Sequence, residues 1–273
     1  MREAAEVIPE AFASPFMQKA LAAGVLVSLL TGIISAFVVL RKMSFVGAGI
    51  SHAAFGGVAI GFYAGFNPLV AAVIYAVLVA IGIEATAKKG KISEDVSIGI
   101  FYSVSMAIGI ALVSLSASYN IDLFGYLFGN ILAITRQEII LTLATSVVII
   151  TMILFFLKEL FLITYNEELA RVSGVRVDLL NTLFLVALSV SIVVSIRIVG
   201  IIMVSALLVI PGATARLFAK GLRSMIALSC SAGLAAVTAG LFLSYQYDIA
   251  PGAGIVLTSA VIFFVSLIAR KSA

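Results

Sequence analysis

The sequence predicts an all-α membrane protein, a polytopic helical bundle with eight or nine transmembrane helices. Of its 273 residues, 63% are hydrophobic and 11% are charged, whereas a soluble domain is about half apolar and about a quarter charged. Apolar runs of roughly 18 residues or more, long enough for a spanning helix, recur along the whole chain. The period-two alternation of a membrane β-barrel is absent from the sequence. We therefore expect one multi-pass domain over residues 1–273 in the cytoplasmic cell membrane.

Polar breaks between the apolar runs delimit the expected helices. Asn67 and Pro68 place a proline in the first turn of a span, where its missing N–H costs nothing. Residues 1–15 contain acidic residues and prolines, unlike a signal peptide, and are expected to lie at the surface. The expected spans are 16–40, 49–66, 69–87, 95–118, 136–157, 178–196, 199–219, 224–245 and 252–269.

The distribution of basic residues predicts the orientation. With the N-terminus outside and nine crossings, the 17 Lys and Arg residues all fall on the cytoplasmic side except Arg2, Lys19, Arg136 and Arg197, as the positive-inside rule requires. The same rule explains the net charge of +4 without a nucleic-acid partner. Only Arg197 interrupts 178–219, so this segment is either two helices joined by an outer hairpin or one broken span.

Two segments differ from the spans. Residues 120–135 are amphipathic and too short to cross, which predicts an outer interfacial or re-entrant helix. Residues 164–175 predict an amphipathic helix on the cytoplasmic side, because Leu169 and Val172 form an apolar i, i+3 pair among charged residues and Gly174 suits a C-terminal cap. This helix either lies on the membrane surface or docks another subunit, and the pattern alone favours neither.

The chain lacks the sequence motifs of an enzyme. It has no phosphate loop for nucleotide hydrolysis and no H-E-x-x-H zinc motif, and its single cysteine, Cys230, offers neither a disulfide nor a thiolate metal site. Acidic residues are almost absent from the spans, which disfavours a self-contained, ion-coupled carrier. We therefore expect neither catalysis nor a permanently bound cofactor.

The second span combines small residues with the only histidine of the chain, His52. Its neighbours on the same helix face, Ala48, Gly56 and Ala59, offer no side-chain hydrogen bond. Polar groups within a membrane are costly and mark function, which favours a ligand role for His52 over a purely structural one. Beside it runs a small-residue stripe that predicts close helix packing, formed by Gly49, Ala53, Gly57 and Gly61.

Two residues near the ends of the later expected spans, Pro211 and Asp248, have simple structural interpretations. Pro211 predicts a kink, because proline leaves a backbone carbonyl without its helical donor. Asp248, before the last span, predicts a helix cap at the outer end. A role as a gate is the alternative for both residues.

Several stretches together resemble one family, the permease subunit of ABC importers for transition-metal ions such as zinc, manganese and iron. The matches occur in order and cover most of the chain, which is more specific than any single motif. They are RKMSFVGAGISHAAFGGVAIGF (41–62), DLFGYLFGNILAIT (122–135), YNEELARVSGV (165–175), VGIIMVSALLVIPGATARLF (199–218) and DIAPGAGIVLTSAVIFF (248–264).

The resemblance implies a set of partners in the lipid bilayer: a second copy of this chain, cytoplasmic ATPase subunits that bind the ATP, and an extracytoplasmic metal-binding protein that delivers the ion. It also implies that a coupling helix fits a groove on the ATPase, which favours docking over a membrane-surface role. That helix would comprise Tyr165, Asn166, Glu167, Glu168, Leu169, Ala170, Arg171, Val172, Ser173 and Gly174.

His52 matches the family's histidine, which the resemblance implies contacts metal transiently in the translocation path. The family commonly has an aspartate one turn earlier, where this chain has Ala48, and often an acidic residue where Asn166 stands. Imidazole suits zinc, and the absent carboxylate is a ligand that manganese prefers. The expected function is therefore import of a divalent transition-metal ion, with zinc favoured over manganese or iron. The alternatives are an ATPase-independent carrier or channel, and an ABC permease for a nonmetal substrate.

Overall fold

The computed structural model describes residues 15–115 and 134–271, and these ranges are helical with no strand. The surface segment expected over 1–15 and the outer helix expected over 120–135 lie almost entirely outside the described residues. The described helices are α2 (Pro15–Leu40), α3 (Val46–Ala64), α4 (Pro68–Gly90), α5 (Glu94–Leu115), α7 (Arg136–Phe155), α8 (Leu157–Tyr165), α9 (Glu167–Val172), α10 (Val177–Leu207), α11 (Ile210–Phe218), α12 (Leu222–Tyr247) and α13 (Pro251–Lys271).

Eight helical segments in the described ranges are long and apolar enough to cross a membrane, which confirms the polytopic bundle. Most of them agree with the expected spans to within a few residues. Val177–Phe218 is a 42-residue segment made of α10 and α11, and its break at Gly200 lies beside the boundary expected between 178–196 and 199–219.

The Val177–Phe218 segment bends sharply at Gly200, where the backbone leaves the helix with φ 81° and ψ 164°. Only glycine adopts this conformation readily, since it has no Cβ. A straight helix of 42 residues would be roughly 60 Å long, about twice the thickness of the hydrocarbon core. Just before the bend, Arg197 Nη2 lies 3.3 Å from Glu138 Oε1, in the first turn of α7.

The two ends of this segment lie together at the other side of the bundle. Near its start, Asn181 Oδ1 accepts a hydrogen bond of 2.9 Å from Arg41, directly after α2. Beyond the bend, the backbone N–H of Gly212 donates to Ser35 Oγ at 2.9 Å, in the last part of α2. Within the described residues, the segment therefore goes out and returns, which is the geometry of two crossings joined at Gly200.

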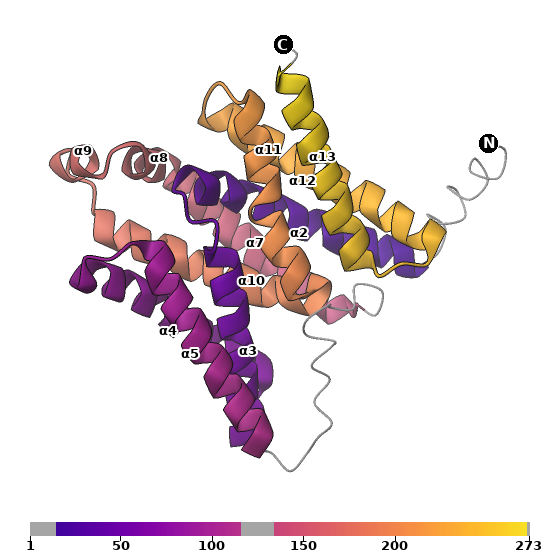
Figure 1. The fold of residues 1–273 in the computed structure, drawn as a ribbon, viewed down its shortest axis with the longest axis horizontal. Coiled ribbons are helices and arrows are strands. Elements are labelled where there is room, and N and C mark those ends of the chain that lie inside the picture. The colour runs from indigo at the N-terminus through magenta and orange to yellow at the C-terminus, as the bar shows by residue number, and fades with distance from the viewer. Residues whose placement is uncertain (1–14, 116–133, 272–273) are drawn as a thin grey trace.

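The bundle is arranged around α10 (Figure 1). Helices α3, α4 and α5 lie side by side and extend to one side of α10, while α2, α11, α12 and α13 pack together on the other. The short helices α8 and α9 lie at the end that also holds Arg41, Lys88 and Arg171, where the basic residues predict the cytoplasm. This end is called the inner end below.

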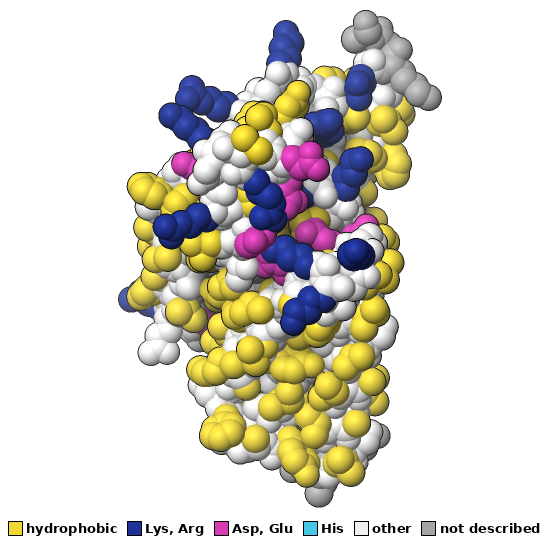
Figure 2. Space-filling model, turned by 90° about the vertical axis from the view of Figure 1, so that its left-hand side faces the viewer, with side chains coloured by type: hydrophobic (Ala, Val, Ile, Leu, Met, Phe, Trp, Pro, Cys, Tyr) yellow, Lys and Arg dark blue, Asp and Glu magenta, His cyan; other side chains and the backbone are white. Residues whose placement is uncertain are grey.

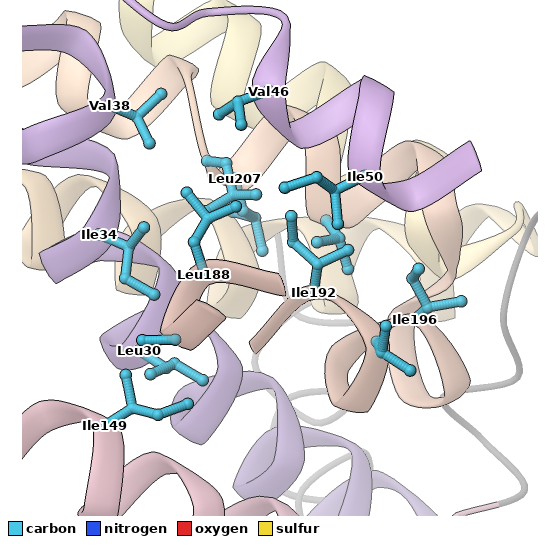
Figure 3. Close-up of a cluster of buried hydrophobic side chains, with 14 of the residues drawn as sticks. Leu30, Ile34, Val38, Val46, Ile50, Ile149, Leu188, Ile192, Ile196 and Leu207 are labelled. Atoms are coloured by element: carbon cyan, nitrogen blue, oxygen red, sulfur yellow. The ribbon is translucent and has the colours of Figure 1, made fainter. Parts of the chain in front are cut away.

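Branched aliphatic side chains fill the centre of the bundle (Figure 3). The ten that are labelled come from four helices and pack against one another, where many close contacts add up to a large dispersion attraction. The residues drawn in the figure include Leu30, Ile34 and Val38 of α2, Val46 and Ile50 of α3, Ile149 of α7, and Leu188, Ile192, Ile196 and Leu207 of α10. The core thereby fixes α3, which carries His52, against α10.

Candidate functional site

The small residues of α3 lie where neighbouring helices approach most closely. A Cβ on Gly57 would lie 2.7 Å from Cα of Ala72, and one on Gly61 would lie 2.8 Å from Cα of Pro68, both in α4. Gly49 faces the side chain of Ile98 in α5. Because these contacts are with backbone or buried side chains, any larger residue would force the helices apart. The stripe, completed by the fully buried Ala53, therefore holds α3 between α4 and α5.

His52 is half-buried on α3, beside this stripe. Its Nδ1 lies 2.8 Å from the backbone carbonyl oxygen of Ala48. A carbonyl oxygen only accepts hydrogen bonds, so Nδ1 carries a hydrogen, and the neutral tautomer that makes this bond has its lone pair on Nε2. Metal-binding histidines are commonly oriented by such a bond from the second ring nitrogen. The backbone thus presents Nε2 as the available ligand atom.

The aromatic ring of Tyr102 in α5 fixes the other side of the imidazole. The two ring centroids are 4.7 Å apart and the rings meet edge to face at 66°, a favourable geometry for aromatic pairs. Sequence spacing within α3 gave no sign of this contact, because Tyr102 comes from a different helix. The imidazole is held by one hydrogen bond and one ring contact.

In the part of the chain that the structure describes, His52 has no acidic or thiol neighbours that would complete a metal site. Among the described residues, no group of three or more His, Cys, Asp and Glu side chains is placed to hold a metal ion. The helix position one turn before His52 is Ala48, which contributes its carbonyl to the imidazole instead of a carboxylate. A single chain therefore offers one nitrogen ligand, fewer than the roughly four that a stable zinc site uses.

Pro211 and Asp248 both occupy helix boundaries. Pro211 is buried in the first turn of α11, and the helix is interrupted between Leu207 and Ile210, because proline has no N–H to continue the ladder. Asp248 is the C-terminal cap of α12, in the left-handed conformation with φ 53°. It thus closes the preceding helix, whereas the sequence suggested a cap beside the following one.

The expected helix over 164–175 is divided at Asn166. Tyr165 ends α8, and Asn166 adopts extended backbone with φ −157° before α9 begins. The side-chain oxygen of Asn166 accepts a 2.9 Å hydrogen bond from the backbone N–H of Leu169, which is a standard N-cap bond. An asparagine at this position therefore starts a new, shorter helix, and Gly174 ends it with φ 82°.

Helix α9 projects an apolar surface at the inner end. Val172 is 87% exposed and Leu169 is 48% exposed, while Ala170 is fully buried beneath them. Tyr165, the last residue of α8, is 77% exposed. Apolar side chains held out from a helix in this way, with a charged surround, are typical of a protein interface. The surface comprises Tyr165, Leu169 and Val172 and is called the α9 surface below.

Ion pairs connect α9 to α10 and α4. Arg171 Nη2 lies 2.7 Å from both Glu167 and Asp178, and Asp178 also lies 2.7 Å from Lys88 Nζ. These hydrogen bonds raise the pKa of Arg171 above its usual value, with Asp178 as the main cause and Glu167 as the second. The network ends at Glu84, 2.8 Å from Lys88.

Figure 2 shows a face of the molecule on which basic and acidic groups gather in the middle and upper part, above a mostly apolar lower part. Exposed ion pairs each contribute about 0–1 kcal/mol, so the network orients α9 without holding it rigidly. Sequence reasoning did not find this network. The i, i+4 spacing of Glu84 and Lys88 was a visible signal, but the pairing with Asp178 depends on the tertiary fold.

Comparison with known proteins identifies the family of this chain. Residues 13–270 match the model of the ABC 3 transport family. Manganese import system permease protein ScaB of Streptococcus gordonii is 38% identical over 92% of this chain and 90% of its own length. High-affinity zinc uptake system membrane protein ZnuB of Haemophilus influenzae is 32% identical over 92% of this chain and 97% of its own length.

The fold is also similar to a solved structure, PsaBC from Streptococcus pneumoniae in complex with Fab. The TM-score is 0.84 at 37% sequence identity, and the match covers 96% of this chain and 94% of that chain. The chain therefore belongs to the ABC 3 transport family and is a multi-pass protein of the cell membrane, a transport component related to the permeases of manganese and zinc ABC importers.

Proposed function

We propose that this chain is the membrane subunit of an ABC importer that moves a divalent transition-metal ion, preferentially zinc, into the cytoplasm. The sequence has no phosphate loop, so separate ATPase subunits supply the energy. The names of the relatives from Streptococcus gordonii and Haemophilus influenzae support metal-ion import as the substrate class. An extracytoplasmic binding protein would capture the ion and deliver it to the path.

The observation that carries the proposal is the orientation of His52. Its Nδ1 donates to the Ala48 carbonyl, so Nε2 is free to contact an ion. Two copies of the chain related by a two-fold axis would bring two such nitrogens to one path, with water or backbone oxygens completing the shell. Such a site binds weakly, which suits transport, because an ion that binds too tightly does not leave.

The α9 surface is the proposed contact with the ATPase. It lies at the predicted cytoplasmic end, and its exposed apolar residues Leu169 and Val172 suit burial in a hydrophobic groove on a partner. Asn166 sets the start of the helix, and Arg171 anchors it to α10 through Asp178. The same arrangement on both copies would engage two ATPase subunits.

The ligand chemistry of His52 underlies the choice of zinc. Imidazole nitrogen suits zinc, whereas manganese prefers carboxylate and carbonyl oxygen. Position 48, one turn before His52, holds alanine and supplies no carboxylate. The relatives include both manganese and zinc systems. We therefore expect the preference for one ion over the other to depend on the ligands close to His52.

Competition for uptake tests this choice. The complex of permease, ATPase and binding protein is reconstituted in liposomes, and ATP-driven zinc uptake is measured against manganese and iron. We expect zinc to be taken up at the lowest concentration, and we expect Ala48→Asp to shift the preference toward manganese, because it adds an oxygen ligand one turn from His52. A wild-type preference for manganese would contradict the choice of zinc, and a complex that transports none of the three ions would favour a nonmetal substrate.

A further inference from the structure

Arg41 follows the last residue of α2 and extends into the inner end of the bundle. Its Nε donates to Thr164 Oγ1 at 3.2 Å, and its Nη1 donates to Asn181 Oδ1 at 2.9 Å. The guanidinium carbon also lies 4.5 Å from the ring centroid of Phe184. One side chain thus joins three elements: the end of α2, the end of α8 and the first half of α10.

The environment of this guanidinium is costly for a charge. Burial lowers the pKa of Arg41 to about 10, and its Nη2 is buried with no hydrogen-bond partner among the described residues. A charge held under these conditions does not stabilise the fold well, since burial opposes the favourable contacts. The planar guanidinium instead offers a rigid link between groups at fixed angles, which a flexible ammonium does not.

Thr164, which accepts the Arg41 hydrogen bond from its place in α8, is close in sequence to the α9 surface. Thr164 precedes Asn166, the cap of α9, by two residues, and its own hydroxyl hydrogen goes to the Leu160 carbonyl at 2.7 Å. This bond to the α8 backbone fixes the Thr164 hydroxyl, so that a lone pair of Oγ1 faces Arg41. Any displacement of α9 that moves the end of α8 must change the Arg41 bond or move Arg41 with it.

In the C-terminal direction along the chain, Arg41 is followed closely by α3, the helix that carries His52. Met43, two residues after Arg41, is buried, and α3 begins at Val46, six residues before His52. The turn between α2 and α3 is closed by the Met43 N–H, which donates to the Val38 carbonyl at 3.0 Å. The linkage from Arg41 to the start of α3 is thus short and internally bonded.

A cavity of about 420 Å³ adjoins Arg41 at the inner end. Its walls include Glu94 at the start of α5 and Glu167 at the start of α9. Both carboxylates attract Arg41 electrostatically. The cavity leaves space beside the starts of α5 and α9 for α9 to move relative to α5.

We propose that Arg41 is a positioning residue that transmits movement of α9 to α2, α10 and the start of α3. The inference rests on the proposed function, since it assumes that an ATPase moves α9. A second, exposed route runs through Arg171, Asp178 and Lys88. Arg41 differs from that route because its bonds are partly buried and reach α2 and α10, which lead to the proposed ion path.

The ratio of metal uptake to ATP hydrolysis in the reconstituted complex tests the inference. For Arg41→Gln we expect hydrolysis to stay within about twofold of wild type while uptake per ATP falls at least about tenfold, in the range of coupling effects between distant sites. The neighbouring Lys42 is exposed, so Lys42→Gln serves as the matched control and is expected to keep the wild-type ratio. Uptake and hydrolysis that fall in proportion, or that both stay unchanged, would overturn the inference.

Two further variants keep the test decisive if Arg41→Gln does not assemble. Thr164→Val and Asn181→Leu each remove one acceptor of Arg41 and leave its charge in place. We expect both to lower uptake per ATP, and an unchanged ratio in both would reject the role of Arg41. A wild-type complex that hydrolyses ATP without metal uptake would instead overturn the proposed function, and this inference with it.

Discussion

His52→Ala is expected to reduce metal uptake by the reconstituted complex severely while leaving its assembly intact. The substitution removes the nitrogen that the Ala48 carbonyl and the Tyr102 ring hold in place. Loss of a ligand nitrogen removes several kcal/mol of ion stabilisation, and since each ~1.4 kcal/mol is about tenfold, we expect uptake to fall roughly 100-fold. The measurement is the initial rate of ATP-driven zinc uptake at equal amounts of complex.

The adjacent Ser51 provides a matched control for this variant. Its Oγ is buried on the same helix and has no hydrogen-bond partner among the described residues, so Ser51→Ala removes a polar atom without removing a contact. We expect Ser51→Ala to transport at nearly the wild-type rate. If His52→Ala did the same, His52 would be a structural residue and the ion would pass elsewhere.

Placing aspartate at both Leu169 and Val172 is expected to separate the permease from its ATPase. Both side chains are exposed in the isolated chain, so the folded permease tolerates the change. Burying two unpaired carboxylates in an apolar groove costs several kcal/mol, which corresponds to a loss of affinity of at least about 100-fold. Co-purification of the ATPase measures this directly, and ATP-driven uptake is expected to be lost with it.

Glu168→Gln, on the same helix, is the control for the α9 surface. Glu168 is exposed, and its substitution leaves both apolar side chains in place, so we expect the ATPase to remain bound. An ATPase that still co-purifies with the double aspartate variant would show that α9 is not the docking element. The membrane-surface role, which the sequence pattern leaves open, would then be favoured.

The spans were predictable because each one is a continuous apolar run between polar breaks. A break near Arg197 was predictable as a hairpin or a broken span, but its place at Gly200 was not, because the φ of 81° is seen only in the folded backbone. Pro211 could be assigned from sequence because a missing N–H breaks the helix in any context. Asp248 could be assigned to a helix boundary, but the choice between the two helices depended on its left-handed backbone.

The candidate site was partly predictable for a similar reason. His52 is conspicuous because it is the only histidine in the chain and lies within a span. Its bond to the Ala48 carbonyl follows from helix geometry, but Tyr102 comes from α5 and required the tertiary structure. Arg41 reads as an ordinary topology signal, and its partners Thr164 and Asn181 lie 123 and 140 residues away along the chain.

The central claim is that this chain imports a metal ion only when an ATPase drives it. The most direct test is zinc accumulation against a gradient in liposomes that contain the permease alone or the permease with its ATPase and binding protein. We predict sustained accumulation only with the complete complex and ATP, and none when ATP is replaced by a nonhydrolysable analogue. Sustained uphill accumulation by the permease alone would contradict the claim and identify an ATPase-independent carrier.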